Sequence, residues 1–501
     1  MIEPQIPSID WLAIAPELSL FAAAVIIVLG RSIVRHSPRV FEASLLTAVT
    51  GIVASAFFTA LQWIIVRDDG PYQAINGMVA VDGFSVFVRT VVLLATSLAL
   101  LISTGYLRRE GLEGPEYVAL MLLSATGMAV MVSANDLIVV FLALEVLSIA
   151  LYVLAAFDRN RLESQEAGLK YFVLGAFSSA VFLYGVALVY GATGTTALTG
   201  IARFLATTGL LETGTLLAGL ALLLVGLGFK IAAAPFHMWA PDVYQGSPTP
   251  VTAFMAAATK AAAFGALLRV LMGTFDLYRV DWRPAIWGLA VLSLVVGSVG
   301  AVVQTDVKRM LAYSSVSHAG YAMIGVQVAT DRGTAAALVY LLVYAVSDCR
   351  GLRCRDGRRA SGRRPALARR LQGARCPRTG PRRDPDPLPA RAGRCARYSR
   401  VRGEAGCLRS RGRIRAVPLG DHRHARRGDR GLRLSPHRAR DVHRGGGRRC
   451  HSHGDPEAPA RGSRHRNGAR RGRSAGDRAG VVPGRILDFA RDATLLLGGA
   501  G

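Results

Sequence analysis

Cysteine is absent from the first 348 residues of this chain, and lysine is absent from the remainder. All six cysteines lie in residues 349–501, at spacings that match no paired zinc or haem pattern, so the first part has no disulfide framework. Residues 1–348 hold 19 basic and 22 acidic side chains, a net charge of −3. Residues 349–501 hold 41 arginines against 12 acidic side chains, a net charge of +29. The overall charge of +26 therefore describes neither part.

Long polar segments are also missing from residues 1–348, which leaves no room there for a soluble catalytic domain, a nucleotide-binding glycine loop or a flavin site. Instead, apolar stretches of roughly 18–25 residues recur, long enough for helices to cross a hydrocarbon core of about 30 Å. We expect an all-α polytopic membrane protein with about eleven spans, at 11–30, 42–66, 84–106, 117–134, 136–157, 168–192, 214–234, 249–273, 285–304, 312–329 and 334–347. The first span is too poor in preceding positive charge to be a cleaved signal peptide.

Basic residues gather in alternate loops between these spans, and such loops usually stay on the cytoplasmic side. These loops contain Arg31, Arg35, Arg39, Arg108, Arg109, Arg159, Arg161, Lys170, Lys308 and Arg309. The intervening loops contain fewer basic residues, chiefly Arg67, Arg203, Arg279, Arg283 and Arg332. The pattern predicts an N-terminus on the outer side of the membrane.

Three charged residues stand out within the spans, where a charge costs about 2.5–3.5 kcal/mol and persists only with a partner or a purpose. Glu145 lies near the middle of an otherwise uncharged run, LIVVFLALEVLSIALYVLAA. Lys230 closes the run LLLVGLGFK, five residues before Pro235. Lys260 lies in VTAFMAAATKAAAFGALL, whose small residues let neighbouring helices or water approach closely.

Two interpretations fit this acid and these two bases. The first is a structural ion pair between Glu145 and one lysine, with the other lysine reaching towards an interface. The second, which we favour, is a proton relay. Burial disfavours the charged form of lysine and a nearby carboxylate favours it, so a lysine whose partner can move is a switchable proton site. An arginine at such a site would stay charged.

The segment PFHMWAPDVYQGSPTP at 235–250 is rich in proline and separates two apolar spans. It predicts either an ordinary cytoplasmic loop or a helix broken at membrane depth, where irregular backbone lines a cavity or is buried in protein. In the second case Lys230 lies just before the break and His237 just after it. Both residues are then candidates for proton transfer.

A second polar cluster, QTDVKRMLAYSSVSHAGY, occupies residues 304–321. Its position between two spans predicts that Lys308 and Arg309 are loop charges. His318 falls inside the following span, where a neutral imidazole could carry protons or could be a core histidine with its hydrogen bonds satisfied.

Three motifs together resemble one family. LALEVLSIALYVL, GFKIAAAPFHMWAPDVYQGSPTPVTAFMAAATKAAAF and DVKRMLAYSSVSHAGYAMIG are similar to the antiporter-like, proton-pumping membrane subunits of bacterial complex I, and the second motif matches subunit N best. The resemblance covers essentially all of residues 1–348 in order. It implies inverted five-helix repeats with broken helices. It also implies a proton path through Glu145, Lys230 and Lys260. Their positions in the sequence make His237 and His318 secondary candidates for proton transfer.

The same resemblance implies a membrane subunit of NADH:quinone oxidoreductase in the bacterial inner membrane, which translocates protons as electrons pass from NADH to quinone. As part of that translocase the chain counts as an enzyme subunit without a redox centre, a bound cofactor or a metal of its own. NADH, FMN, iron–sulfur clusters and quinone belong to the parent complex, and the partners are its other membrane subunits and the lipid bilayer. The alternative is a subunit of a multisubunit cation/proton antiporter or a membrane-bound hydrogenase, which share this helix plan.

The family carries a further lysine on a broken twelfth helix, which this sequence lacks. Arginine without lysine is typical of GC-rich DNA read out of frame. Read one nucleotide later, the codons of residues 348–356 permit TAGAFAVVM, and those of 396–405 permit PGTAGFVAKL, with Lys or Arg at the codon that overlaps Glu404. We therefore predict a frameshift over residues 349–480, which would make this Arg-rich segment non-native and disordered.

Residues 480–497, GVVPGRILDFARDATLLL, again resemble the C-terminus of the family, so 481–501 is interpreted as its remnant. Arginine pairs such as Arg363–Arg364 would attract phosphates. The out-of-frame reading accounts for them without a nucleic-acid partner, and none is expected. If the printed reading frame stands, the chain lacks most of its second repeat and is expected to be non-functional.

Overall fold

The computed structural model describes residues 10–34, 40–208, 214–360, 489, 490 and 492, which belong to one compact unit. Its longer helices are α1 (Trp11–Ile33), α2 (Val40–Asp69), α3 (Gly83–Glu110), α4 (Pro115–Ser133), α5 (Leu137–Ala155), α6 (Leu162–Thr193), α12 (Arg279–Val303), α13 (Val307–Val328) and α14 (Asp331–Ala360). The shorter helices are α7 (Leu198–Thr208), α8 (Gly214–Lys230), α9 (Trp239–Gly246), α10 (Thr249–Phe254), α11 (Lys260–Leu268), the π-helices η1 (Met255–Thr259) and η2 (Arg269–Thr274), and the 3-10 helix η3 (Asp276–Tyr278).

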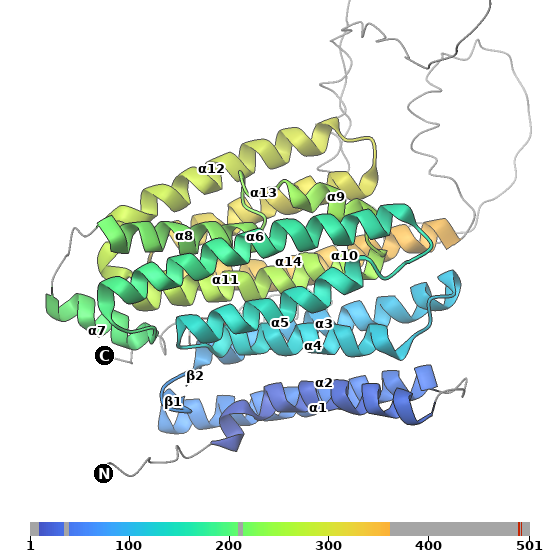
Figure 1. Cartoon of the computed structure of the whole chain (residues 1–501), viewed down its shortest axis with the longest axis horizontal. Coiled ribbons are helices and arrows are strands. Elements are labelled where there is room, and N and C mark those ends of the chain that lie inside the picture. The colour runs from blue at the N-terminus through green and yellow to red at the C-terminus, as the bar shows by residue number, and fades with distance from the viewer. Residues whose placement is uncertain (1–9, 35–39, 209–213, 361–488, 491, 493–501) are drawn as a thin grey trace, which may run out of the picture. The chain divides into compact units, whose positions relative to one another are not determined.

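Eight of the described segments are long and apolar enough to cross a membrane, by length and composition. They are α1 to α6, the run Thr249–Thr274 that joins α10 to η2, and Asp276–Val303. The three other expected spans coincide with α8, which is apolar but only 17 residues long, and with α13 and α14. All the expected spans therefore lie on helices (Figure 1), and the all-α membrane fold is confirmed.

A small β-hairpin is the feature that the sequence did not predict. Strands β1 (Tyr72–Ala74) and β2 (Val79–Val81) pair antiparallel between α2 and α3, with Tyr72 opposite Val81. The next residue, Asp82, begins α3 with a capping box in which its carboxylate accepts a hydrogen bond from the Ser85 amide. The hairpin therefore leads directly into a firmly capped helix.

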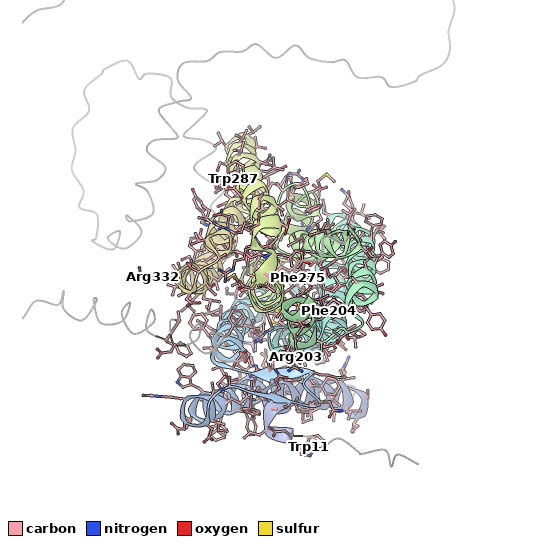
Figure 2. All side chains as sticks on the ribbon, turned by 90° about the vertical axis from the view of Figure 1, so that its left-hand side faces the viewer. Trp11, Arg203, Phe204, Phe275, Trp287 and Arg332 are labelled. Atoms are coloured by element: carbon pink, nitrogen blue, oxygen red, sulfur yellow. The ribbon has the colours of Figure 1, made fainter. Side chains whose placement is uncertain are left out.

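The basic loops lie at one end of the helix bundle. Arg31, at the end of α1, contacts Glu116 of α4 at 3.3 Å, and Arg108 of α3 contacts Glu42 of α2 at 3.3 Å. Figure 2 faces the opposite end, where Trp11, Arg203 and Arg332 lie. The basic loops therefore share one side of the bundle, as their alternation along the sequence predicts. The placement of the N-terminus on the outer side of the membrane stays a prediction.

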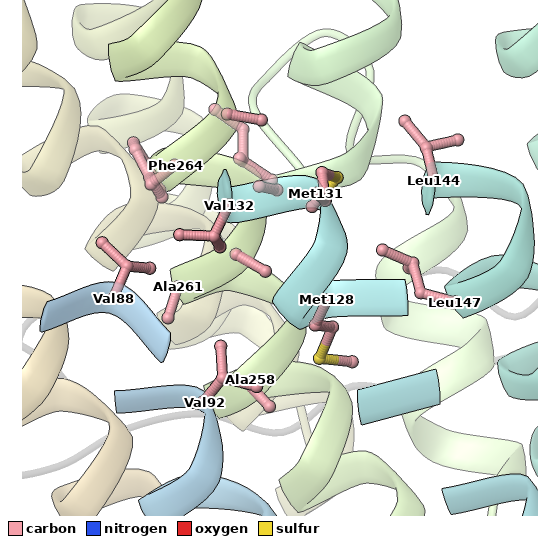
Figure 3. Packing of buried hydrophobic residues seen from close by; sticks show 14 of the residues in the cluster. Val88, Val92, Met128, Met131, Val132, Leu144, Leu147, Ala258, Ala261 and Phe264 are labelled. Carbon is pink, nitrogen blue, oxygen red and sulfur yellow. The ribbon is translucent and has the colours of Figure 1, made fainter. Parts of the chain in front are cut away.

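The helix that carries Lys260 lies in the centre of the bundle. The 18-residue apolar window of the run Thr249–Thr274 is completely buried inside the protein, whereas only 22% of the corresponding window of Asp276–Val303 is buried. Figure 3 shows Ala258, Ala261 and Phe264 of this helix packed against valines of α3 and α4. Alanine and glycine allow this close approach, so the sequence positions Lys260 away from lipid.

The structure describes α14 as continuing to residue 360, past the expected boundary at 348. The predictions that 349–480 is a disordered, frameshifted segment and that 481–501 is a native remnant fall almost wholly outside the described residues, as does the expected twelfth helix around Glu404. Of the last segment, Phe489 is described, and its ring contacts those of Trp63 at 4.6 Å and Phe87 at 5.1 Å.

Candidate functional site

Lys230 is the last residue of α8 and is buried, with 3% of its surface exposed. Its Nζ donates hydrogen bonds to the Ser148 hydroxyl of α5 at 2.7 Å and to the Tyr171 hydroxyl of α6 at 3.3 Å. The same nitrogen lies 5.3 Å from the centre of the Tyr171 ring and 5.9 Å from that of Tyr152. Neutral hydroxyls and aromatic faces thus surround this ammonium group.

Glu145 precedes Ser148 by one helical turn on α5, so both side chains face the same side of that helix. The Glu145 carboxylate interacts electrostatically with Lys230. Within the described part of the chain, however, no ion pair joins them, and the buried Oε1 of Glu145 has no hydrogen-bond partner. The structure therefore brings Glu145 and Lys230 into one site with Ser148 between them, and it does not show the direct ion pair of the first interpretation.

The helix is interrupted immediately after Lys230, as the broken-helix interpretation requires. Ala232 has a φ of 58°, the Ala234–Pro235 peptide bond is cis, and α9 begins only at Trp239. The Ser293 hydroxyl of α12 accepts a hydrogen bond from the Ala234 amide at 2.9 Å and satisfies this irregular backbone. His237 lies in the break, and its buried Nδ1 has no hydrogen-bond partner among the described residues.

Lys260 forms a second site of the same kind. It is 3% exposed and follows directly on the π-helix η1, a distortion that is frequent at functional positions. Its Nζ donates to the Ser315 carbonyl and, at 2.5 Å, to the Ser315 hydroxyl of α13. The Tyr344 ring of α14 lies 5.8 Å from the nitrogen, and the Tyr344 hydroxyl donates to Ser315 at 3.0 Å.

His318 and Asp348 lie beside the Lys260 site. The Nδ1 of His318 is 2.5 Å from the Tyr340 hydroxyl, and the His318 ring centre is 4.9 Å from that of Tyr344. Asp348 interacts electrostatically with Lys260, and its buried Oδ2 has no hydrogen-bond partner among the described residues. Asp348 is not among the residues predicted from the sequence, because it lies at the boundary between the apolar part of the chain and the Arg-rich part.

Comparison with known proteins agrees with this arrangement. A family model described as "NADH:quinone oxidoreductase/Mrp antiporter, TM" matches residues 134–354. NADH-quinone oxidoreductase subunit N of Mycobacteroides abscessus is 43% identical over 380 residues, which cover 68% of this chain and 69% of that protein. The chain belongs to the NADH-quinone oxidoreductase subunit N family.

Two further relatives define how far this membership extends. Subunit N of Trichlorobacter lovleyi is 46% identical over 297 residues, so the chain covers 60% of that relative's length. A chain of respiratory complex I from Thermus thermophilus, solved with bound aureothin, is 37% identical with a TM-score of 0.55 and covers 67% of this chain and 69% of its own. The match to the family model includes Glu145, Lys230 and Lys260 and begins after α4.

The prediction that Lys308 and Arg309 lie in a loop is wrong. Both lie in the first turn of α13, where the Asp306 carboxylate accepts hydrogen bonds from their amides. Lys308 is 3% exposed, and its Nζ donates to the Ser247 carbonyl at 2.6 Å. The expectation failed because the Asp306 N-cap starts the helix at Val307, five residues before the expected span begins at 312.

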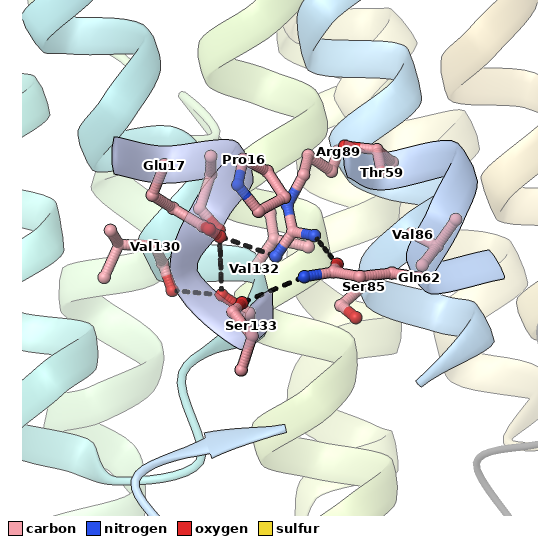
Figure 4. Close-up of polar contacts among 12 residues, drawn as sticks. Pro16, Glu17, Thr59, Gln62, Ser85, Val86, Arg89, Val130, Val132 and Ser133 are labelled. Carbon is pink, nitrogen blue, oxygen red and sulfur yellow. Dashed lines mark hydrogen bonds and ion pairs between the residues drawn. The ribbon is translucent and has the colours of Figure 1, made fainter. Parts of the chain in front are cut away.

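Two buried ion pairs were missed, although their charges interrupt expected spans just as the lysines do. Arg89 of α3 donates to Glu17 of α1 at 2.5 Å, and Ser133 of α4 also donates to Glu17 at 3.2 Å (Figure 4). Arg269 in η2 holds Asp82 through two hydrogen bonds of 2.9 Å. The same search for charges in apolar runs would have found Glu17, Arg89 and Arg269.

The arrangement supports proton transfer better than tight binding of a fixed ion. Lys230 and Lys260 each donate a hydrogen bond to a serine hydroxyl, and a carboxylate acts on each of them without forming an ion pair with it among the described residues. No group of three or more metal-ligating side chains occurs in the part of the chain that the structure describes.

Proposed function

We propose that this chain moves protons across the bacterial inner membrane as the N subunit of a respiratory NADH:quinone oxidoreductase. One observation carries the proposal: two buried lysines, each at a helix distortion, hydrogen-bond to a serine hydroxyl and face aromatic rings. Burial of a charge in such surroundings is costly, and the cost depends on whether a carboxylate is near and ionised. A shift of Glu145 relative to Lys230 would therefore decide whether Lys230 holds its proton.

In this proposal Glu145, Lys230 and Lys260 act in sequence. Approach of the Glu145 carboxylate favours the charged form of Lys230, and its withdrawal favours proton release towards Lys260. Ser148, Tyr171 and Ser315 keep each ammonium group in place through their hydroxyls. His237 and His318 lie near the two lysine sites, and we assign them secondary roles in proton transfer.

Electron transfer from NADH to quinone belongs to other subunits in this proposal, because the redox groups of the parent complex would be held there. FMN, the iron–sulfur clusters and quinone supply the driving reaction, and this chain's own residues only hold and release protons. Its partners would be the other membrane subunits of the complex. The proposal includes no nucleic-acid partner.

The test is a Glu145→Ala substitution in a complex that contains this chain, made in both the printed and the frame-restored gene. We expect proton translocation per electron pair to fall by about tenfold or more, because a group that controls a proton step is worth roughly 10²–10⁴ in rate. Proton uptake in sealed, inverted vesicles measures the effect. Glu113→Ala is the matched control, since Glu113 is a surface acid that forms an ion pair with Arg108 at 3.5 Å. Unchanged pumping in Glu145→Ala would refute the relay.

A cation/proton antiporter is the second candidate function, because the matched family model includes the Mrp antiporters by name. The two candidates differ in the ion that accompanies the proton. Proton movement by a complex I subunit would depend on NADH and quinone and not on Na⁺. Proton uptake that follows an imposed Na⁺ gradient without NADH would favour the antiporter.

A further inference from the structure

Helix α9 is short, yet it contacts the surroundings of both buried lysines. At its start, the Trp239 ring stacks on the Tyr171 ring, with 4.6 Å between centres and 12° between planes. Tyr171 in turn accepts a hydrogen bond from Lys230 at 3.3 Å. Towards its end, the Gln245 carbonyl accepts a hydrogen bond from Lys308 of α13 at 3.4 Å, and α13 also carries Ser315, the residue on which Lys260 rests. A movement of α9 would therefore be felt at both lysines.

Covalent connection alone does not fix the position of α9. The break at residues 231–238 separates it from α8, and Ser247 and Pro248 separate it from α10. Close packing holds one end, where a Cβ on Gly246 would lie 2.2 Å from the Glu163 carbonyl oxygen of α6. The buried side chains of Trp239, Val243 and Tyr244 pack in the core, and polar contacts add the remaining attachments.

Asp242 makes the main polar attachment of α9 to its neighbours. Its Oδ2 accepts a hydrogen bond from Lys170 of α6 at 2.9 Å, and its Oδ1 accepts one from Arg309 of α13. Arg309 also donates to the Gln245 side chain at 3.1 Å. One carboxylate thus ties α9 to two long helices at once. Charge-assisted hydrogen bonds of this kind are stronger than neutral ones.

These ion pairs border a cavity of about 390 Å³ at the end of the bundle that carries the basic loops, lined mainly by charged side chains of α6, α9 and α13. The Asp242 side chain is 35% exposed, so water reaches the pair and the pair can open. Burial raises the pKa of Asp242, but the hydrogen bonds from Lys170 and Arg309 outweigh it and hold the pKa below the ordinary aspartate value. The attachment is thus present at neutral pH and reversible.

We propose that Asp242 is a positioning residue that latches α9 between α6 and α13, and so keeps Tyr171 in place at Lys230 and Ser315 in place at Lys260. This inference rests on the proposed function, because it assumes that the two lysines move protons. Opening the latch would disturb both sites together, whereas a change at Ser148 or Tyr344 would disturb only one. Asp242 itself carries no proton in this account.

The experiment compares Asp242→Asn, Arg309→Gln and Glu166→Gln in the full chain reconstituted into liposomes. Glu166→Gln is the matched control, because Glu166 contacts the same Lys170 at 2.7 Å from within α6, so this ion pair does not join α6 to α9. Amide hydrogen exchange of residues 239–246, measured by mass spectrometry, reports whether α9 is held. Proton uptake driven by an imposed potential reports whether the lysine sites work.

We expect Asp242→Asn and Arg309→Gln to speed amide exchange over residues 239–246 by roughly tenfold, because each substitution removes charge-assisted hydrogen bonds. Both substitutions should also slow proton uptake. Glu166→Gln should change neither. Unchanged exchange in Asp242→Asn would overturn the latch, even if uptake fell, because Asp242 would then act as a proton carrier. Faster exchange with undiminished uptake would also overturn it, since α9 would not control the lysines. A wild-type chain that moves no protons would count against the proposed function, and the exchange data would still decide whether Asp242 holds α9.

Discussion

Arg89 and Arg269 differ from Lys230 and Lys260 in the partners that stabilise their buried positive charge. Arg89 and Arg269 each hydrogen-bond directly to a carboxylate, Glu17 and Asp82, whereas Lys230 and Lys260 hydrogen-bond to serine hydroxyls. An arginine paired with a carboxylate stays charged and fixes the helices around it. A lysine on neutral partners depends on a carboxylate that does not touch it, so its charge can change. In the proposed function, Arg89 and Arg269 are permanent charges and Lys230 and Lys260 are switchable ones.

Their places in the fold support this division. The Glu17–Arg89 pair joins α1 and α3, which precede the part matched by the family model, and Asp82–Arg269 anchors the outer end of the Lys260 helix. The lysines lie at a helix break and beside a π-helix, where the backbone is irregular. Fixed pairs therefore hold the scaffold, and the switchable lysines lie where the scaffold is interrupted.

Arg89→Ala should have the largest effect on stability. A small effect would contradict the view that the buried arginine pairs fix the surrounding helices. Removal of one partner leaves Glu17 buried and unpaired, which costs about 3–5 kcal/mol. Thermal unfolding in detergent should show a clear fall in Tm, while proton uptake per folded molecule stays normal. The double variant Glu17→Gln/Arg89→Met should recover most of the Tm, because it leaves no charge unpaired. Loss of proton uptake in a folded double variant would show that this pair, too, handles protons.

Lys260→Met should show the opposite pattern, with little change in Tm and a fall in proton uptake of about tenfold or more. Lys260 hydrogen-bonds to Ser315 and forms no ion pair among the described residues, so its removal breaks no direct charge pair and stability should change little. Thr259→Val is the control on the same helix, because the buried Thr259 hydroxyl has no hydrogen-bond partner. Normal uptake in Lys260→Met would place Lys260 among the structural residues.

The exposed Asp242 pair should give the smallest effect, and one that depends on pH. Its pKa is lowered in the folded protein, so the pair stabilises the fold above the ordinary aspartate pKa of 3.8 and loses this contribution as pH falls through and below that value. With the side chain 35% exposed, we expect no more than about 1 kcal/mol. Tm measured from pH 7 to pH 3 should fall less in Asp242→Asn than in the wild type. An identical pH dependence in both would contradict the assignment.

The sequence alone located the spans and the three relay candidates, because long apolar runs and the charges inside them are direct signals. It could not identify Ser148, Tyr171, Ser315 and Tyr344 as lysine partners. Serine and tyrosine are common in membrane helices, and only the packing of α5, α6, α13 and α14 brings these four to the lysines.

Other residues were within reach of sequence analysis and were still missed. Glu17, Arg89 and Arg269 interrupt apolar runs as plainly as Lys230 does. Lys308 was assigned to a loop because the Asp306 cap was not read as a helix start. The β-hairpin was missed because strands of three residues give too short an alternation to recognise.

The most direct test of the central claim is the Lys230→Arg substitution, measured by proton uptake in sealed vesicles beside Arg89→Lys. Arginine keeps the positive charge of Lys230 but does not release its proton at physiological pH. We expect uptake to fall by about tenfold or more in Lys230→Arg while the protein remains folded, and to stay near the wild-type rate in Arg89→Lys. Normal uptake with arginine at position 230 would contradict the account, because the site would then need only a fixed charge.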